Sequence, residues 1–278
     1  MKRTVVGVVL IAGLAQLTVT PAQAAVATDP AKALQVVWTR GKAVNIVSTA
    51  KVDYGRGASY TSYMDGTVGF GPQGEIASDT SQRVQFSKEM SSGLKKRGME
   101  EYVAREETPL RVISSGHADY VSGPRFADAL PQGTSWVRYP STERPASNPL
   151  LDILEPGTLK ALLAHRTSWQ DGVLKGSIKT DKLAKVSRSF ASRFGAYAES
   201  KPAGTVSYTL RLSSAGLVER LSAKGVLRSH KGSVRIASDT RYSAWGREVT
   251  VLLPLRGDVL DSEQLEDKVP YEVPGAWN

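Results

Sequence analysis

The sequence predicts an α+β fold in which a large twisted antiparallel sheet packs against a few short helices. Three observations support this class. From residue 44, β-branched and aromatic residues alternate with Gly, Asp and Pro turns, and no helical period is found until about residue 150. Residues 205–212 alternate apolar and polar side chains, which is typical of a strand with one buried face. The stretches with a helical apolar stripe are short.

The first 24 residues have the features of an export signal. Lys2 and Arg3 precede an uncharged apolar run at residues 5–17, and Ala22-Gln23-Ala24 matches an Ala-x-Ala cleavage site. The run is shorter than a membrane-spanning helix, although an uncleaved anchor is the alternative. We therefore expect residues 1–24 to be a signal peptide cleaved near Ala24. The expected product is a secreted, extracellular protein, either free or associated with the cell wall.

The remaining chain is expected to form one domain, residues 25–257, followed by a loop or tail at residues 258–278 that is acidic and contains Pro. Its first helix is expected at residues 30–38, because Asp29 supplies an N-cap and Pro30 a proline at the first helical position. Residues 155–164 and 181–194 place apolar side chains at helical spacing and predict two more helices.

Strands are expected in two groups. The first group comprises residues 66–71, 82–86, 110–115, 118–121 and 135–139. The second is a four-strand meander over residues 205–212, 217–227, 234–242 and 249–253. Its turns are expected at Gly216, at Gly232 and at Trp245-Gly246.

Charge and cysteine content exclude several classes of function. The net charge of +9 falls to +7 when Lys2 and Arg3 are removed with the signal, which favours anionic membrane or wall surfaces as partners. The basic residues are too scattered to predict nucleic-acid binding. The chain has no cysteine, so it has no disulfide, thiolate metal site or cysteine nucleophile. The sequence leaves the oligomeric state open.

Short motifs offer little chemistry. Residues 69–74 match the spelling G-x-G-x-x-G, but no amphipathic helix follows, so a β-turn is expected. Ser48 and Lys51 match S-x-x-K, the pattern of serine acyl-enzymes, yet Lys51 points away from Ser48 if both lie on a strand. The histidines are far apart in sequence and show no metal-ligand spacing: His117, His165 and His230. We expect no catalytic residue, no metal and no cofactor.

A sheet with one apolar face can bury that face in two ways. Helices can fill it as an ordinary core, or the sheet can curl over them and leave an apolar cavity for a ligand. From the residues alone, the filled core is favoured.

The order of elements and several segments resemble the bacterial LolA-like half-barrel proteins, in particular the LppX/LprG-type lipid-binding lipoproteins. The segments that carry the resemblance are Phe70-Gly71, residues 77–80, 130–136, 155–159 and 238–246. The resemblance implies a curved antiparallel half-barrel wrapped over helices, with an apolar cavity for acylated ligands. The lipid-anchoring cysteine of that family is missing here, which puts membrane tethering in doubt.

We therefore expect a non-enzymatic secreted protein that holds a lipid or another long apolar ligand, as a carrier or a sensor. The residues expected to line its cavity are Val68, Phe70, Val84, Phe86, Val112, Trp136, Tyr208, Leu210 and Leu212. One alternative is an interaction module with a filled core that binds the cell wall or a partner protein. A remote alternative is a serine hydrolase that uses Ser48 and Lys51.

Overall fold

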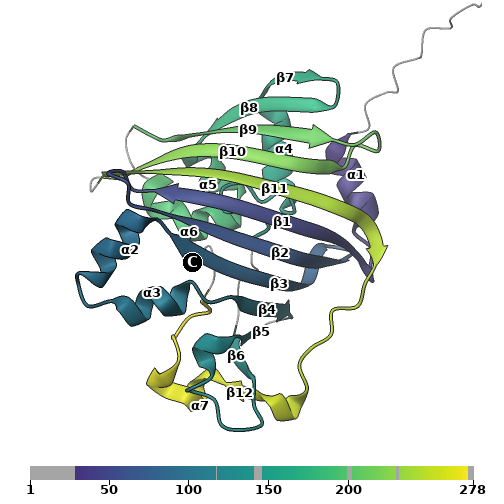
Figure 1. Ribbon diagram of the computed structural model, residues 1–278. Coiled ribbons are helices and arrows are strands. Elements are labelled where there is room, and N and C mark those ends of the chain that lie inside the picture. Colours follow the sequence, from purple (N-terminus) through teal and green to yellow (C-terminus); the bar gives the residue numbers. More distant parts are fainter. Residues whose placement is uncertain (1–28, 117, 141–145, 199–201, 230–231, 275–278) are drawn as a thin grey trace, which may run out of the picture.

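The computed structural model describes residues 29–116, 118–140, 146–198, 202–229 and 232–274, and the expected signal peptide lies outside these ranges. The fold is α+β, as predicted. Within the described residues, twelve strands form one open sheet, and seven short α-helices accompany it. The strands bow over helices α4, α5 and α6, which lie together on one face of the sheet (Figure 1). We call this helix-covered face the inner face and the opposite one the outer face.

The sheet consists of two meanders joined along one pair of strands. The spatial order is β12-β6-β5-β4-β3-β2-β1-β11-β10-β9-β8-β7. Strands β1 to β6 and strands β7 to β11 therefore pair in chain order within each meander, β1 pairs with β11 to join the meanders, and β12 pairs in parallel with β6. The strands are β1 (Lys42–Asp53), β2 (Ser59–Gly71), β3 (Gly74–Phe86), β4 (Leu110–Ser115), β5 (Ala118–Ser122), β6 (Trp136–Pro140), β7 (Arg166–Gln170), β8 (Val173–Lys179), β9 (Thr205–Leu212), β10 (Val218–Ser229), β11 (Gly232–Glu248) and β12 (Val259–Asp261).

The helices are short and mostly begin at recognisable signals. They are α1 (Pro30–Val37), α2 (Lys88–Lys95), α3 (Glu100–Glu106), α4 (Pro156–Ala164), α5 (Thr180–Val186), α6 (Arg188–Ala198) and α7 (Ser262–Leu265), with 3-10 turns η1 (Pro124–Phe126), η2 (Arg256–Asp258) and η3 (Glu266–Lys268). The predicted first helix is confirmed: the Asp29 carboxylate accepts a hydrogen bond of 3.0 Å from the Ala31 amide, and Pro30 occupies the first turn.

The helix expected at residues 181–194 is two helices, because a tertiary contact interrupts it at Ser187. Ser187 has an extended backbone, and its hydroxyl donates to the Glu155 carboxylate at 2.6 Å. The same carboxylate accepts from the Ser189 amide at 2.8 Å, which caps the start of α6. Glu155 therefore fixes the angle at which α6 enters the inner side of the sheet.

Two predictions in the strand regions were wrong. Helices α2 and α3 lie in a region expected to be β; in these two helices the structure buries only Val103, so neither carries the apolar stripe that signals a helix. Residues 249–253 are not a strand, because β11 continues past the expected turn at Trp245-Gly246 to Glu248. The chain there forms a bulge, where Ala244 and Gly246 have positive φ and the pairing with β1 shifts register.

Residues 258–274, expected to be a loop or tail, are partly ordered by packing. Strand β12 and helix α7 follow one another, and Leu265 and Val269 are buried against β4–β6. The apolar cluster in which they take part includes Leu110, Val112, Val121, Phe126, Val137 and Tyr139. Burial of two aliphatic side chains, about 1.5–3 kcal/mol each, explains why this acidic segment packs on the domain.

The main core lies under β1, β2 and β8–β11. The expected alternation in β9 is confirmed, since Val206, Tyr208 and Leu210 are buried and Thr205 and Ser207 are exposed. Part of this core is filled by the chain itself through residues 146–154, which we call the plug. The plug is buried throughout, and four of its side chains join the main cluster: Leu150, Leu151, Ile153 and Leu154.

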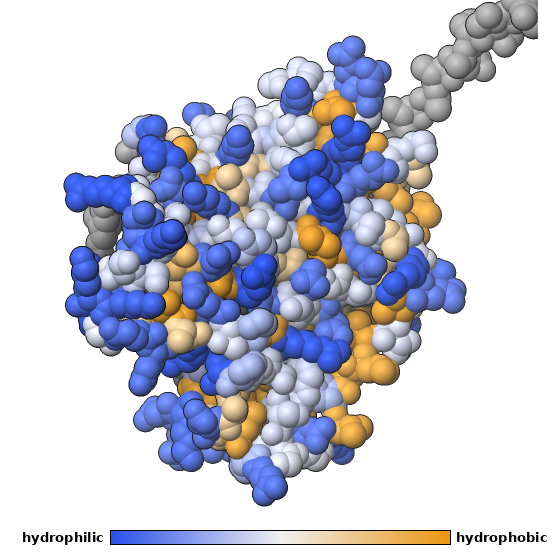
Figure 2. Space-filling view, viewed as in Figure 1, coloured by the Kyte–Doolittle hydropathy of each residue, from blue (hydrophilic) through white to orange (hydrophobic). Residues whose placement is uncertain are grey.

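Exposed apolar residues gather beyond β11. Leu252 and Leu255 are each 75% exposed. Figure 2 views the outer face, which is mixed in hydropathy, with hydrophobic residues toward the right margin, where the chain beyond β11 runs in Figure 1.

Candidate ligand-binding cavity

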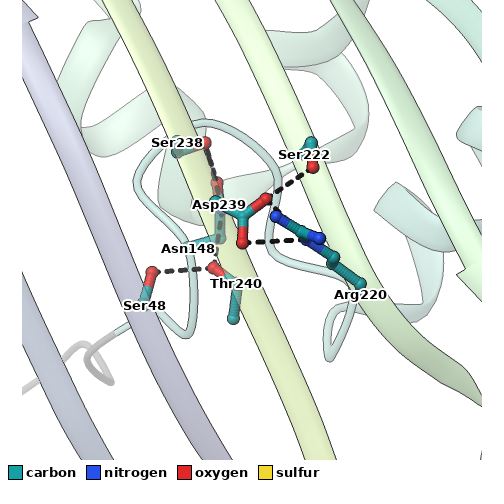
Figure 3. Close-up of polar contacts among 7 residues, drawn as sticks. All are labelled: Ser48, Asn148, Arg220, Ser222, Ser238, Asp239 and Thr240. Carbon is teal, nitrogen blue, oxygen red and sulfur yellow. Dashed lines mark hydrogen bonds and ion pairs between the residues drawn. The ribbon is translucent and has the colours of Figure 1, made fainter.

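A network of buried side chains fixes the plug to the inner face of the sheet (Figure 3). The Asn148 amide group donates to Thr240 Oγ1 at 2.9 Å and to Ser238 Oγ at 3.1 Å. Its carbonyl oxygen accepts from the amides of Leu150 and Leu151, at 2.9 and 3.0 Å. All four hydrogen-bonding positions of the Asn148 side chain are used, so the plug has one well-defined position.

Asp152 holds the second half of the plug in place through hydrogen bonds within the plug. Its Oδ1 accepts from Ser147 Oγ at 2.7 Å and from the Leu154 amide at 3.0 Å, and Ser147 also contacts the Tyr242 hydroxyl at 3.0 Å. Complete burial raises the pKa of Asp152 to about 6; the negative charge of Glu155 adds to this, and the hydrogen bonds and the Arg193 guanidinium oppose it.

Where the plug ends, the inner side of the sheet is hollow. A cavity of about 1190 Å³ lies between strands of both meanders, helix α6 and the segment from residue 262 to residue 274. Its buried wall comes from β3–β6 and includes Gln82, Val112, Asp119 and Tyr139. Tyr271 and Glu272 line the opposite side and are exposed, so this side opens to solvent.

Aromatic rings form one side of the cavity. Tyr54 and Tyr60 lie 6.2 Å apart between ring centroids, and Phe194 and Tyr197 of α6 lie 6.4 Å apart. Burial raises the pKa of Tyr60, and neighbouring Tyr54 adds to this shift. Val52, Leu227, Val234 and Ile236 continue this side as an aliphatic surface. This part of the cavity suits an apolar group.

The charged residues of the cavity are mostly acidic. Asp119 lies on the buried wall, and four exposed acidic side chains line the solvent side: Glu263, Glu266, Asp267 and Glu272. Among the described lining residues, Arg193 is the one cation. Its positive charge lowers the pKa of Asp152 and so partly opposes the effect of burial. Buried Arg125, whose charge acts on Tyr139, is paired with Glu106 at 2.6 Å.

A row of buried polar side chains crosses β3–β6 on the inner face. Ser78 pairs with Ser114, Ser114 with Asp119, and Asp119 with Tyr139 in the strand register. Within the described residues, Ser78 Oγ, Ser114 Oγ and Tyr139 Oη have no hydrogen-bond partner, although all three are buried. Burial raises the pKa of Tyr139 to about 12. Burying a polar group without a hydrogen-bond partner costs free energy, and most buried polar groups in proteins have one. Three such groups in one row are therefore unusual.

The nine residues expected to line a cavity occupy four different environments. Val112 lines it. Five belong to the filled core under the plug and helices: Val68, Phe70, Tyr208, Leu210 and Leu212. Val84 and Phe86 are half-buried on β3, and Phe86 packs against Tyr60 and Tyr102. Trp136 lies on the outer face under Arg111, because the neighbouring Val137 points inward and side chains alternate along β6.

Several lining residues were not expected from sequence. Phe194 and Tyr197 continue the stripe of Phe190 at helical spacing, and this signal could have identified them. Tyr54 directly follows β1 and Tyr60 is the second residue of β2, positions at which the sequence carries no signal for a ligand. The acidic residues come from the segment expected to be a loop or tail.

The remaining motifs are explained by the fold. Ser48 is buried on the inner face with its hydroxyl 2.7 Å from Thr240 Oγ1, whereas Lys51 is exposed on the outer face, so the S-x-x-K pair is not assembled. Residues 69–74 span the end of β2, a turn at Pro72-Gln73 and the start of β3, so the predicted β-turn is confirmed. His165 Nδ1 contacts the Ala161 carbonyl at the end of α4, and His117 and His230 lie outside the described residues.

The described residues offer neither a cluster of metal ligands nor a membrane-spanning helix. No group of three or more His, Cys, Asp or Glu side chains there is arranged to hold a metal ion. Likewise, none of the helices in that part of the chain has the length and hydropathy needed to span a bilayer.

These features define an α+β protein with an open, mainly antiparallel sheet, a plug over one half of the inner face and a cavity over the other. No protein-family model matches the chain, and no curated protein is significantly similar to it. Among solved structures, a hypothetical protein from Chlamydia trachomatis is 8% identical with a TM-score of 0.25, covering 82% of this chain and 98% of its own. A porin-like protein from Bacteroides uniformis is 9% identical with a TM-score of 0.22, covering 71% and 95%.

Proposed function

We propose that this protein binds a lipid or another long apolar ligand in the cavity between the sheet, α6 and the C-terminal segment. The observation that carries the proposal is the cavity of about 1190 Å³, with an aromatic and aliphatic side and an opening to solvent. Its volume exceeds that of ordinary small-molecule pockets, about 300–1000 Å³. The plug and helices α4–α6 fill the other part of the inner face, and Leu265 and Val269 cover part of β4–β6, so the cavity is the space that these side chains leave open.

The energetics suit reversible binding. Each methylene moved from water into an apolar site contributes about 0.8 kcal/mol, and a bilayer offers nearly the same gain. Exchange of an acyl chain between a membrane and the cavity is therefore almost balanced, and it needs no cofactor. A carrier or a sensor of such ligands needs a cavity of suitable shape and an opening, and both are present among the described residues.

The resemblance to LolA-like half-barrel proteins and the export signal expected in residues 1–24 support the same proposal. In this reading the chain is a secreted relative of those lipid-binding proteins that lacks the anchoring cysteine. It would exchange ligand with membranes without being tethered to one.

Titration with 1-dodecanol, a neutral ligand with a single long chain, tests the proposal. We expect saturable binding, measured by isothermal titration calorimetry below the solubility limit of the alcohol. Val234 lines the cavity from β11, so the larger side chain in Val234→Trp should occupy part of it. We expect dodecanol to bind at least about tenfold more weakly, which corresponds to a loss of about 1.4 kcal/mol of hydrophobic contact.

The matched control is Val47→Trp, a Val-to-Trp change on β1 at a side chain that is 55% exposed on the outer face. This variant should bind like wild type. Absence of saturable binding to wild type, or equal losses in both variants, would contradict the proposal.

A further inference from the structure

The cavity joins an apolar side to an acidic one. Tyr54, Tyr60, Phe194 and Tyr197 provide aromatic surface, and the solvent side is lined by Glu263, Glu266, Asp267 and Glu272. A purely apolar ligand gains nothing from these carboxylates, and an anionic headgroup would be repelled by them.

The cations near the cavity offset only part of this charge, because exposed Lys268 is the one cation of residues 262–274, beside four carboxylates. The charge of Arg193 acts on buried Asp152, and Arg125 is held by Glu106 at 2.6 Å. The acidic side is therefore expected to carry a negative potential, although the whole chain is basic at +9. This local charge is opposite to the one that the overall composition indicates.

A second and independent observation comes from the buried wall. Tyr139 lines the cavity, is 1% exposed, and its hydroxyl has no hydrogen-bond partner within the described part of the chain. It sits beside Asp119 in the β5–β6 register, and Asp119 also lines the cavity. A buried hydroxyl of this kind is normally paired, so a ligand group with hydrogen-bonding capacity is a suitable partner for it.

We propose that the ligand is a cationic amphiphile, a long apolar chain that ends in an ammonium group, a class assignment that rests on the function proposed above. The chain lies along the aromatic and aliphatic side, and the ammonium group binds at Tyr139 and Asp119. The exposed carboxylates attract the cation to the opening and raise its local concentration.

Three probes of equal chain length test the headgroup: dodecylamine, 1-dodecanol and dodecanoate, each below its aggregation concentration at pH 7. Dodecylamine is protonated there, as a lysine side chain is. We expect it to bind about tenfold more tightly than dodecanol at low salt, with dodecanoate weakest. High salt should reduce the preference for the amine, because exposed charges are screened.

Two variants locate the source of the preference. The double variant Glu266→Gln, Glu272→Gln removes two exposed charges beside the cavity, and it should weaken binding of dodecylamine but not of the other two probes. The control double variant Glu100→Gln, Glu101→Gln on α3 should leave binding of dodecylamine unchanged. Tyr139→Phe removes only the unpaired hydroxyl, so the fold should keep its stability while the amine binds several-fold more weakly.

The outcomes separate the two proposals. If none of the three probes binds, the cavity function itself fails. If dodecanol binds as tightly as the amine, or dodecanoate binds more tightly, the cavity binds ligand but the cationic class is wrong. If the Glu266/Glu272 variant and its control behave alike, or if Tyr139→Phe binds the amine like wild type, the assigned position of the headgroup is wrong.

Discussion

At the scale of single residues, the plug depends on polar side chains in an apolar setting. Asn148 joins Ser238, Thr240 and two plug amides, and Thr240 also contacts Ser48. On the other face of the same strand, Asp239 binds Arg220 and Ser222 (Figure 3). The inner set is buried and the outer set is more exposed, so the inner contacts contribute more to stability.

Asp152 makes stability depend on pH. Its pKa in the folded protein, about 6, lies above its ordinary value of 3.8. The folded state therefore binds a proton more tightly than the unfolded state, and this stabilisation is complete below about pH 4 and is lost as pH rises through about 6. The loss amounts to about 3 kcal/mol for a shift of this size. The variant Asp152→Asn keeps an acceptor oxygen at this position but has no group that ionises in this pH range.

Urea unfolding of wild type and Asp152→Asn between pH 4 and 7 tests this prediction. The variant should gain about 2–3 kcal/mol relative to wild type as pH rises over this range. Asp128→Asn, the same change at an exposed side chain, serves as the control for the substitution itself. A difference between wild type and Asp152→Asn that does not change with pH would show that burial of this carboxyl has no energetic cost.

At the scale of elements, the segment from residue 262 to residue 274 forms the solvent side of the cavity, and a small set of contacts holds it on the sheet. β12 adds to β6 in parallel, Asp261 binds Arg138 at 2.8 Å, and Leu265 is 5% exposed. Leu265→Ala should lower the free energy of unfolding by about 2–5 kcal/mol, as for other buried leucines. Leu252→Ala, at a side chain that is 75% exposed, should change it by less than about 0.5 kcal/mol.

Hydrogen exchange of the β12 and α7 amides measures the same effect locally. Leu265→Ala should accelerate it, and Leu252→Ala should not. Equal exchange rates in the two variants would mean that Leu265 does not hold the segment in place.

The sequence predicted elements whose signals are local. Asp29-Pro30 identified the first helix, and alternation identified β9. Helices α2 and α3 were missed because they lack an apolar stripe, and the expected turn at Trp245-Gly246 is a bulge because β1 continues to pair beside it. For the site, only Val112 among the expected residues lines the cavity, since a plug that fills half of the inner face is a tertiary feature without a local signal.

At the scale of the whole molecule, the account depends on the division of one sheet face into a filled half and a hollow half. The pairing of β1 with β11 brings both meanders into one surface. The plug and α4–α6 then cover one part, and the C-terminal segment encloses the remainder. The main competing site for an apolar ligand is the exposed segment around Leu252 and Leu255.

Nuclear Overhauser contacts between 1-dodecanol and ¹³C-labelled methyl groups distinguish these two sites directly. We expect contacts from the alcohol chain to Val52, Val234 and Ile236, which line the cavity. Contacts confined to Leu252 and Leu255, or none at all, would contradict the claim that the hollow half of the inner face holds the ligand.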